Sequence, residues 1–477
     1  MKRCHRWVLV ALMALAGCAS SLHVRNQEAT GVGRVWPDER LFSPAPLVLG
    51  LAFSGGGTRA ASLAYGVMKE LEAIPVPLPG GGTSNLLKEV DYISSVSGGS
   101  FAAAFYTLFQ DDPEWGEHFE QKVLREPLED RLLWRLLNPV NLIPVALTDY
   151  SRTDVAAEYY GEQIFDNRRM RDLPRRPWLI LNATDMVTGI RFEFTSDFFA
   201  CLGSDVAGFP VGHAVAASSA FPVAFKPVTL MSFGQERDGC ITDRDEGYIE
   251  ANFTDLYRRN MALRKVKHLG RDTIQYIQLS DGGITDNLGL QGLLERFRDG
   301  PLANGMRNGQ VKGVLFISVN AANASDTMSG ERREGPSSAE VIVRSLDLML
   351  ENASARTATV FFDGVSESVR EGECAFFAHG QCFLIDIKFN DVNDKATRDL
   401  LNGIGTRLQL KENEVDALID AGRTLLYCGN GQANWKALVK MVQLFEQEAG
   451  TTGFVDRIEA SARGKCQGWP DTTPSGQ

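Results

Sequence analysis

The sequence predicts an α/β fold in which helices cover a mostly parallel, doubly wound sheet. Apolar runs of strand length alternate with segments whose apolar residues have the spacing of a helix. Three short glycine-containing turns, at 54–59, 97–99 and 281–283, each follow one of these runs. Ligands of doubly wound sheets bind beyond the carboxyl ends of the strands. We therefore expect the three turns to lie together at that edge of the sheet.

The individual elements follow from their composition and from the turn residues that bound them. The first strand is expected at 46–53 with a helix at 60–71, and the second strand at 90–96 with a helix at 100–109. Further strands are expected at 178–183, where a hairpin ends near Phe194, and at 274–279 and 313–319.

Composition divides the chain into four parts. Residues 18–45 are polar and contain Gly, Pro and Ser, so they are interpreted as a tether between residues 1–17 and the folded body. Residues 46–330 form the main domain, and residues 331–477 are expected to be mainly helical and to pack on it. Residues 112–165 are expected to form a helical cap, which is either a lid, a membrane-contacting surface or a plain buried subdomain.

The first 17 residues are interpreted as a targeting signal. Basic residues precede a short apolar run, 8–16, which is about half the length needed to span a bilayer. The run ends in Leu15-Ala16-Gly17-Cys18, which resembles the signal of bacterial lipoproteins, where the cysteine becomes the acylated first residue. Ala19 follows, and the same resemblance implies an exported lipoprotein in the outer membrane of a Gram-negative bacterium. An ordinary secretory signal is the alternative.

Charge and motif content exclude several classes of site. The net charge of −11 argues against nucleic acid as a partner, because such affinity rests on Lys and Arg. No later stretch is long and apolar enough for a membrane-spanning helix. Neither Cys-x-x-Cys nor His-Glu-x-x-His occurs, so no metal and no other cofactor is expected.

Six cysteines remain for disulfides once Cys4 leaves with the signal and Cys18 carries the lipid. An even number of cysteines in an exported chain permits a disulfide framework. Cys374 and Cys382 lie near enough in the chain to close a small loop. Spacing otherwise leaves the pairing open among these two and Cys201, Cys240, Cys428 and Cys466.

The turn after strand 90–96 exposes one serine. Strand-to-helix turns that present a nucleophile usually follow the pattern G-x-S-x-G, since their flanking residues must be small. Here the sequence is Ser95-Val96-Ser97-Gly98-Gly99, in which Ser95 replaces the first glycine. Ser97 is therefore the predicted nucleophile. Ser100 is the candidate nucleophile in an alternative register of the motif, but it would lie one turn into the helix. A further alternative is that the serine serves only as the N-cap of the helix and has no chemical role.

Gly55, Gly56 and Gly57 lie between the first strand and its helix. Glycines let the backbone approach a ligand closely, and amides at a helix N-terminus stabilise negative charge. We expect these residues to form an oxyanion hole, with Arg59 bracing the loop or favouring negative charge. The alternative is a phosphate or dinucleotide cradle. However, the loop lacks the Gly-Lys-Ser/Thr of a Walker A motif, and Ala60 occupies the last glycine position of G-x-G-x-x-G.

Asp281 follows an apolar strand and precedes Gly282 and Gly283, which permit close approach of another segment. As a general base it would accept the proton of Ser97 and return it to the leaving group. One alternative is a simple Asp-Gly turn. The other is a triad with His379 as the base, although the context of His379 favours a loop or buried structural histidine.

Taken in order, these turns resemble the motifs of the patatin-like phospholipase family. The segment from Ser54 to Ala60 is similar to its oxyanion motif, and Ser97 with Gly99 is similar to its nucleophile turn. Asp281-Gly282-Gly283 matches its Asp-Gly-Gly motif, with Asn287 following as expected. Two further blocks agree, Ala183-Thr184-Asp185 and the segment from Ala217 to Pro222. The likeness covers about residues 47–300, with weaker support to about residue 430.

The resemblance implies a three-layer α/β/α sandwich in which residues 46–330 form a patatin-like catalytic domain. It also implies a Ser97–Asp281 dyad without histidine, no metal, and hydrolysis of acyl esters by a phospholipase, lysophospholipase or esterase. The expected partners are a membrane lipid or another acyl ester as substrate, and a membrane held through the N-terminal lipid. The alternatives are an acyltransferase that uses the same dyad and a non-catalytic envelope lipoprotein of the same fold.

Overall fold

The structure is a computed structural model of the chain, and it describes a defined set of residues. These are 26–29, 43–222, 224–233, 241, 243–250, 256–268, 274–298, 300–322, 348, 352, 354–359 and 380–466. The expected signal at 1–17, the lipidation site Cys18 and most of the tether lie outside the described residues. His379, Cys240 and Cys374 lie outside them as well.

Eight of the described strands form the main sheet, in the order β10-β9-β1-β4-β5-β8-β7, with β6 paired to β5. The five strands from β10 to β5 are parallel to their neighbours, whereas β6, β7 and β8 are antiparallel. The sheet is therefore mostly parallel, as predicted. The strands are β1 (Leu47–Phe53), β4 (Val90–Val96), β5 (Trp178–Asp185), β6 (Ile190–Glu193), β7 (Val228–Met231), β8 (Tyr276–Asp281), β9 (Gly313–Asn320) and β10 (Gln381–Lys388).

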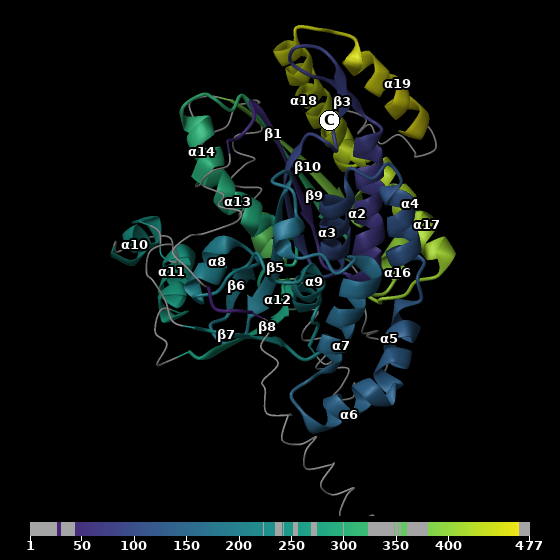
Figure 1. Cartoon of the computed structure of the whole chain (residues 1–477). Coiled ribbons are helices and arrows are strands. Elements are labelled where there is room, and N and C mark those ends of the chain that lie inside the picture. Colours follow the sequence, from purple (N-terminus) through teal and green to yellow (C-terminus); the bar gives the residue numbers. More distant parts are fainter. Residues whose placement is uncertain are drawn as a thin grey trace, which may run out of the picture.

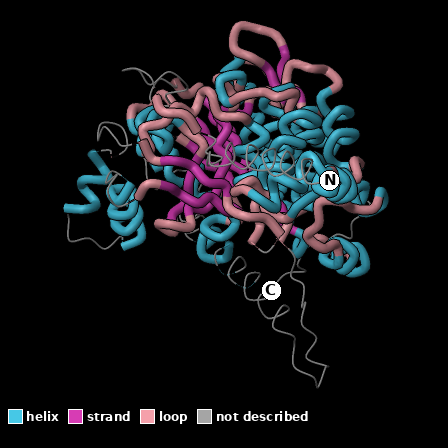
Figure 2. Tube along the Cα trace, turned by 60° about the horizontal axis from the view of Figure 1, so that its bottom comes forward, coloured by secondary structure: helices cyan, strands magenta, loops and turns pink. Residues whose placement is uncertain are grey.

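Helices cover both faces of this sheet, which makes three layers (Figures 1 and 2). Successive residues of β1 belong to two separate cores: Leu49 and Leu51 lie in one, and Val48 and Ala52 lie in the other. A strand that is buried on both faces is typical of a parallel sheet covered by helices. The predicted α/β/α sandwich is confirmed.

The larger core packs β1 against helices from both halves of the chain. These are α2 (Gly57–Glu72), α3 (Gly98–Phe109), α9 (Val211–Ser218), α17 (Glu412–Cys428), α18 (Ala433–Ala449) and α19 (Phe454–Cys466). The smaller core lies under α13 (Leu290–Arg298) and α14 (Gly300–Arg307). Other helices outside 112–165 are α8 (Ser196–Cys201), α10 (Asp243–Glu250), α11 (Leu256–His268), α12 (Gly283–Asp286) and α16 (Lys395–Gly403). Three single 3-10 turns are η4 (Met170–Asp172), η5 (Phe389–Asp391) and η6 (Asn430–Gln432).

Two features depart from the predicted arrangement of elements. β10, in the part expected to be mainly helical, forms the edge of the sheet and pairs along its whole length with β9. A small hairpin of β2 (Pro75–Pro77) and β3 (Thr83–Asn85) also lies outside the main sheet. The C-terminal part is thus built into the same sheet as the rest of the chain.

The predicted cap at 112–165 is helical and has two different halves. It contains α4 (Trp115–Phe119), η2 (Glu120–Leu124), α5 (Leu128–Leu137), α6 (Pro139–Leu147), α7 (Arg152–Tyr159) and η3 (Tyr160–Ile164). Trp115 and Tyr160 are buried and pack edge-on against Tyr106 and Phe101 of α3. By contrast, α5 and α6 expose most of their apolar side chains. The prediction of a plain buried subdomain therefore fits α4, η2, α7 and η3 but does not fit α5 and α6.

One disulfide joins two described cysteines. Cys428 at the end of α17 is bonded to Cys466 at the end of α19. Cys201 and Cys382 are also disulfide-bonded. Within the described part of the chain, no helix combines the length and the apolar composition that crossing a bilayer requires.

Candidate active site

Ser97 sits in a strained turn between β4 and α3. Its φ of 50° and ψ of −122° lie outside the conformations that a non-glycine residue adopts easily. The turn is possible because its neighbours are glycines. A Cβ on Gly98 would lie 2.0 Å from the carbonyl oxygen of Gly57, and one on Gly99 would lie 2.7 Å from the Cβ of Phe53. The strained, close-packed turn holds the Ser97 hydroxyl at the end of the strand.

Asp281 ends β8 directly opposite this turn. The Ser97 hydroxyl donates a hydrogen bond of 2.8 Å to Oδ2 of Asp281, and the Gly283 amide donates one of 2.8 Å to Oδ1. The carboxyl group is almost fully buried, at 4% exposure. Burial raises the pKa of Asp281 to about 6, although its hydrogen bonds from Gly283 and Ser97 oppose the shift. A carboxylate with a pKa near neutrality is suited to accept and return a proton.

The two residues meet although their strands run in opposite directions. We expected Asp281 at the carboxyl edge of a parallel strand, but β8 is antiparallel to β5. In the register of the sheet, Asp281 is paired with Ala183, and the preceding residue of β5, Asn182, is paired with Val96. The ends of β4 and β8 therefore reach the same level of the sheet from opposite sides.

The end of α9 holds both catalytic candidates in place. The Ser218 hydroxyl donates to the Asn182 carbonyl at 2.7 Å and accepts from the Ser97 amide at 3.0 Å. The Gly282 amide donates to the Ser218 carbonyl at 3.1 Å, and the Asp281 amide to that of Ala220 at 3.0 Å. Gly282 has no room for a side chain, because a Cβ there would lie 2.4 Å from the Asn182 carbonyl oxygen. This short segment thus positions the backbone on either side of the hydroxyl–carboxyl contact.

The glycine loop between β1 and α2 lies beside Ser97. A Cβ on Gly55 would be 3.3 Å from the Cβ of Ser97. The Gly55 amide donates to the Asn287 carbonyl at 2.9 Å, so it is occupied. Gly56 and Gly57 have φ values of 140° and 60°, and their amides have no acceptor among the described residues. Of the three amides predicted to form an oxyanion hole, these two are therefore the ones without an acceptor among the described residues.

Asn287 and Arg59 support this loop from two sides. A Cβ on Gly55 would lie 2.4 Å from Oδ1 of Asn287, so the asparagine packs against the glycine backbone. Arg59 is buried, its guanidinium lies beside Gly56, and Nη1 donates to the Ile404 carbonyl at 2.6 Å. Arg59 thus links the glycine loop to the segment that contains Ile404.

The C-terminal part of the chain closes over the same loop. The Thr58 amide and hydroxyl donate to the carbonyls of Arg407 and Leu408, at 2.9 and 2.8 Å. Gly57 is pressed against the Arg407 backbone, where a Cβ would lie 2.4 Å from the carbonyl oxygen. Sequence reasoning missed this contribution, because no local signal links residues 404–408 to a loop so far away in the chain.

The alternative nucleophile Ser100 has a structural place. It is fully buried, and its hydroxyl pairs with those of Ser95 at 3.1 Å and Ser218 at 2.9 Å. Ser95, which replaces the usual glycine, is also fully buried and fits the turn. Ser97 is the serine that faces a carboxylate, whereas Ser100 is held inside the supporting network.

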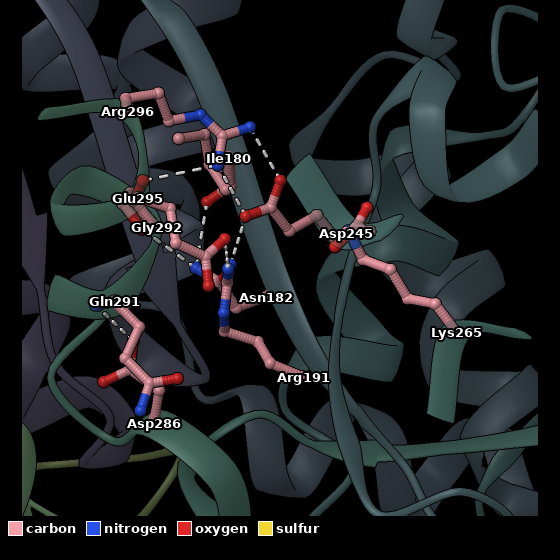
Figure 3. Close-up of polar contacts among 12 residues, drawn as sticks. Ile180, Asn182, Arg191, Asp245, Lys265, Asp286, Gln291, Gly292, Glu295 and Arg296 are labelled. Carbon is pink, nitrogen blue, oxygen red and sulfur yellow. Dashed lines mark hydrogen bonds and ion pairs between the residues drawn. The ribbon is translucent and has the colours of Figure 1, made fainter. Parts of the chain in front are cut away.

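A buried ion cluster contacts the side chain of Asn182 (Figure 3). The fully buried Arg191 of β6 donates to Oδ1 of Asn182 at 2.8 Å, pairs with Glu193 and reaches Glu295 of α13 at 2.6 Å. Arg296 adds two bonds to Glu193, of 2.6 and 2.7 Å. Burial alone would raise the pKa of Glu193, but the two arginines outweigh it and lower that pKa to about 2. The cluster fixes the Asn182 side chain, while the carbonyl of the same residue holds Ser218.

The described residues contain no group of three or more His, Cys, Asp and Glu side chains that could bind a metal. Ser97, Asp281 and the glycine loop offer a hydroxyl, a carboxyl and backbone amides. Ser218, Asn182 and Arg191 were not among the predicted site residues. Ser218 lies in the segment from Ala217 to Pro222 that carried part of the family resemblance, and this was its only signal in the sequence.

Comparison with known proteins identifies one family. The patatin-like phospholipase family matches residues 51–294, which contain the glycine loop, Ser97 and Asp281. No curated protein matches the chain in sequence.

Solved structures with a related fold include human GIVD cytosolic phospholipase A2. It is 12% identical over 84% of this chain and 63% of its own, with a TM-score of 0.43. Its complex with methyl gamma-linolenyl fluorophosphonate is 14% identical over 88% of this chain and 61% of its own, with a TM-score of 0.36. VipD from Legionella pneumophila is 11% identical over 84% of this chain and 67% of its own, with a TM-score of 0.30.

This chain spans less than two thirds of the human enzyme's length, and the structural likeness to all three is loose. The assignment therefore rests on the sequence match, which covers just over half of the 477 residues. The chain belongs to the patatin-like phospholipase family.

Proposed function

We propose that this protein is a lipid acyl hydrolase that uses Ser97 as nucleophile and Asp281 as general base. The observation that carries the proposal is the 2.8 Å hydrogen bond from the Ser97 hydroxyl to the Asp281 carboxylate. The amides of Gly56 and Gly57 lie in the loop packed beside it. Nucleophile, base and oxyanion donors are the three parts that acyl transfer requires.

In the first half of the reaction, the Ser97 oxygen attacks the ester carbonyl while its proton passes to Asp281. The carbonyl oxygen becomes an oxyanion, which the Gly56 and Gly57 amides stabilise; one such donor contributes roughly 3–4 kcal/mol. The bond to the leaving alcohol then breaks. Asp281 returns the proton to the alcohol, and the acyl group stays on Ser97.

In the second half, a water molecule takes the place of the alcohol. Asp281 accepts a proton from the water, which attacks the acyl carbonyl and forms a second oxyanion in the same place. The bond to Ser97 breaks, Asp281 returns the proton to the serine oxygen, and the fatty acid leaves. Protons and charges balance with the carboxylate alone, so the cycle needs no histidine.

We further propose that the chain is exported and anchored by a lipid on Cys18, in the outer membrane of a Gram-negative bacterium. The sequence from Leu15 to Cys18 supports this. The disulfide between Cys428 and Cys466, and those of Cys201 and Cys382, also support it, since disulfides persist in oxidising compartments. Mass measurement of the mature N-terminal peptide tests the anchor: an unmodified Cys18, or its loss, would refute it.

The dyad is tested with Ser97→Ala and Asp281→Asn on a soluble short-chain p-nitrophenyl ester. Each change removes a group that takes part in every bond-making step, so we expect kcat to fall roughly 10⁴-fold or more. Ser219→Ala is the matched control, because among the described residues this nearby hydroxyl bonds to the carbonyls of Val215 and Ala216 in its own helix and not to Ser97 or Asp281. Unchanged turnover in either dyad variant would refute the mechanism. Identification of products from defined phospholipids by mass then gives the bond cleaved.

A further inference from the structure

The hairpin of α5 and α6 exposes an unusual density of large apolar side chains. Twelve large apolar side chains are exposed among the described residues, and six of them lie on these two short helices. Trp134 is 74% exposed and Val140 is 76% exposed. Exposed apolar side chains gathered on one short stretch of chain are a candidate interaction site. The six residues, called the apolar patch below, are Leu133, Trp134, Leu137, Val140, Leu142 and Ile143.

The patch has almost no charge of its own. No charged residue occurs from Leu136 to Thr148. The two arginines of α5 are held by glutamates: Arg131 bonds to Glu126 and Arg135 to Glu162, each at 2.8 Å. Segment 128–149 also contains Glu129, Asp130 and Asp149, so its formal charge is two positive and three negative, or −1. The segment therefore offers apolar contact without an attraction for anions.

The hairpin is joined to the catalytic candidates through two packed helices. α5 packs on α7, and α7 packs on α9, whose last residue is Ser218. The Thr153 hydroxyl at the start of α7 donates to the Lys226 carbonyl at 2.6 Å, which ties α7 to the segment after α9. In Figure 1 the hairpin projects at the bottom of the molecule, and α7 and α9 lie above it, toward the sheet.

We propose that the α5–α6 hairpin is a lipid-docking surface that inserts into the outer layer of a zwitterionic bilayer. Short helices with apolar side chains on one side lie in the membrane interface in this way, and Trp is enriched at that depth. The choice of a lipid surface as occupant rests on the proposed function, because the substrate of a lipid hydrolase is held in such a surface. Contact through protein side chains is distinct from anchoring by an acyl chain on Cys18.

Two other occupants fit the patch less well. A stable protein–protein interface uses roughly 20–30 residues a side, whereas the patch consists of six on two short helices. A second copy of the chain would therefore bury too little here for a stable dimer. The chain's own apolar segment, 8–16, is the second. It fits less well because, in the proposed lipoprotein, it is removed with the signal before Cys18 becomes the first residue. The lack of a net positive charge sets the lipid class, since binding to anionic lipids depends on unpaired Lys and Arg near the surface.

Fluorescence of Trp134 tests the proposal independently of catalysis and of any N-terminal anchor. The full chain is mixed with vesicles of phosphatidylcholine brominated in its acyl chains. The Trp134 signal is the difference between the natural chain and Trp134→Phe. We expect strong quenching of this signal, with no gain when a fifth of the lipid is anionic. Val140→Ser with Ile143→Ser should abolish the quenching, and Leu400→Ser should not, because Leu400 is 51% exposed on another helix.

The same variants separate this proposal from the proposed function. Val140→Ser with Ile143→Ser should lower hydrolysis of phosphatidylcholine vesicles about a hundredfold or more, since the loss of two buried apolar side chains weakens binding by that order. Hydrolysis of the soluble ester should stay unchanged. If neither substrate is cleaved by the natural chain, the proposed function fails, while quenching of Trp134 still decides on docking.

Three results would overturn the docking surface. The first is a Trp134 signal that vesicles leave unchanged. The second is self-association of the natural chain, measured by sedimentation velocity, that disappears in the serine variant; this would assign the patch to a second copy. The third is a Trp134 that acrylamide does not quench even without vesicles, which would assign the patch to the chain's own apolar segment.

Discussion

At the scale of single residues, the contact between Ser97 and Asp281 requires a strained backbone at Ser97 and a buried carboxyl group at Asp281. Ser97 has a backbone conformation that costs of the order of 1–3 kcal/mol, and Asp281 is a carboxyl group with 4% exposure. Tight packing of Gly98, Gly99 and Gly282 against backbone atoms holds both in place. The fold thereby holds a hydroxyl and a carboxyl group in contact, as the proposed dyad requires.

The raised pKa of Asp281 predicts the pH dependence of activity. Burial raises this pKa to about 6, and only the ionised carboxylate can accept the Ser97 proton. We therefore expect kcat/KM for the soluble ester to fall tenfold per pH unit below about pH 6 and to be level above about pH 7. Initial rates between pH 4.5 and 8 check this. A profile that stays level to pH 5 would remove Asp281 as the titrating base.

The same shift predicts that Asp281→Asn stabilises the inactive protein. The folded pKa lies above the ordinary value of 3.8, so the folded state holds the proton more tightly, and the carboxyl group contributes stability that is lost as pH rises through about 6. Asparagine does not titrate. Its advantage should be absent below about pH 4 and reach about 1–3 kcal/mol at pH 8. Thermal unfolding of both proteins at the two pH values measures it, and equal melting temperatures at pH 8 would contradict it.

At the scale of elements, the strands that carry the turns could be predicted, but their pairing could not. The expected strands at 90–96 and 178–183 correspond to β4 and to most of β5. β8 was expected among parallel strands and is antiparallel, because its partners, β5 and β7, are set by tertiary packing rather than by its own apolar run. β10 escaped detection because Asp386 and Lys388, which bond to each other at 2.7 Å, interrupt its apolar pattern.

Some residues of the candidate site could likewise be predicted from the sequence, and others could not. Ser97, Asp281 and the glycine loop have motifs that stand out in the sequence, since each needs small residues beside a reactive or polar group. Ser218 has only a family resemblance as its signal, and Arg407 has none, because each acts through hydrogen bonds made across more than 100 residues of chain. The occupied amide of Gly55 also depends on such a contact, with Asn287.

The buried ion cluster predicts how strongly β6 and α13 depend on each other. Arg191→Met would leave Glu193, which is buried, with Arg296 as its remaining partner and would remove the donor to Oδ1 of Asn182. Removing one member of a buried ion pair costs about 3–5 kcal/mol. Urea unfolding measures this, with Arg125→Met as the control, since Arg125 pairs with Glu120 and Asp416 at the surface and should cost about 1 kcal/mol or less. Equal losses in both variants would contradict the role of burial.

At the scale of the whole molecule, the C-terminal part completes both the core and the glycine loop. β10 extends the sheet beyond β9, and α17 packs along α2, the helix that begins at the glycine loop. The segment at 404–408, just before α17, supplies the carbonyls that hold Thr58 and Arg59. Damage to the packing between these two helices should therefore reach the active site as well as the core.

Glycines allow α2 and α17 to approach closely, which gives a test of this coupling. A Cβ on Gly422 would lie 2.5 Å from the Leu63 carbonyl oxygen, so Gly422→Val must push the helices apart. We expect a loss of about 1–3 kcal/mol in the free energy of unfolding, as for other overpacked cores. Because the displaced helix is joined to residues 404–408, kcat for the soluble ester should fall as well, although Gly422 is far in sequence from the dyad.

Gly403→Val is the matched control for this last prediction. Gly403 is the final residue of α16, and a Cβ there meets nothing within 4 Å. The control should unfold within about 0.5 kcal/mol of the natural protein and keep its kcat. If Gly422→Val lowered stability but left kcat unchanged, the C-terminal part would be a stabilising addition only. A parallel loss of both would mean that the oxyanion loop is held in shape by the far end of the chain.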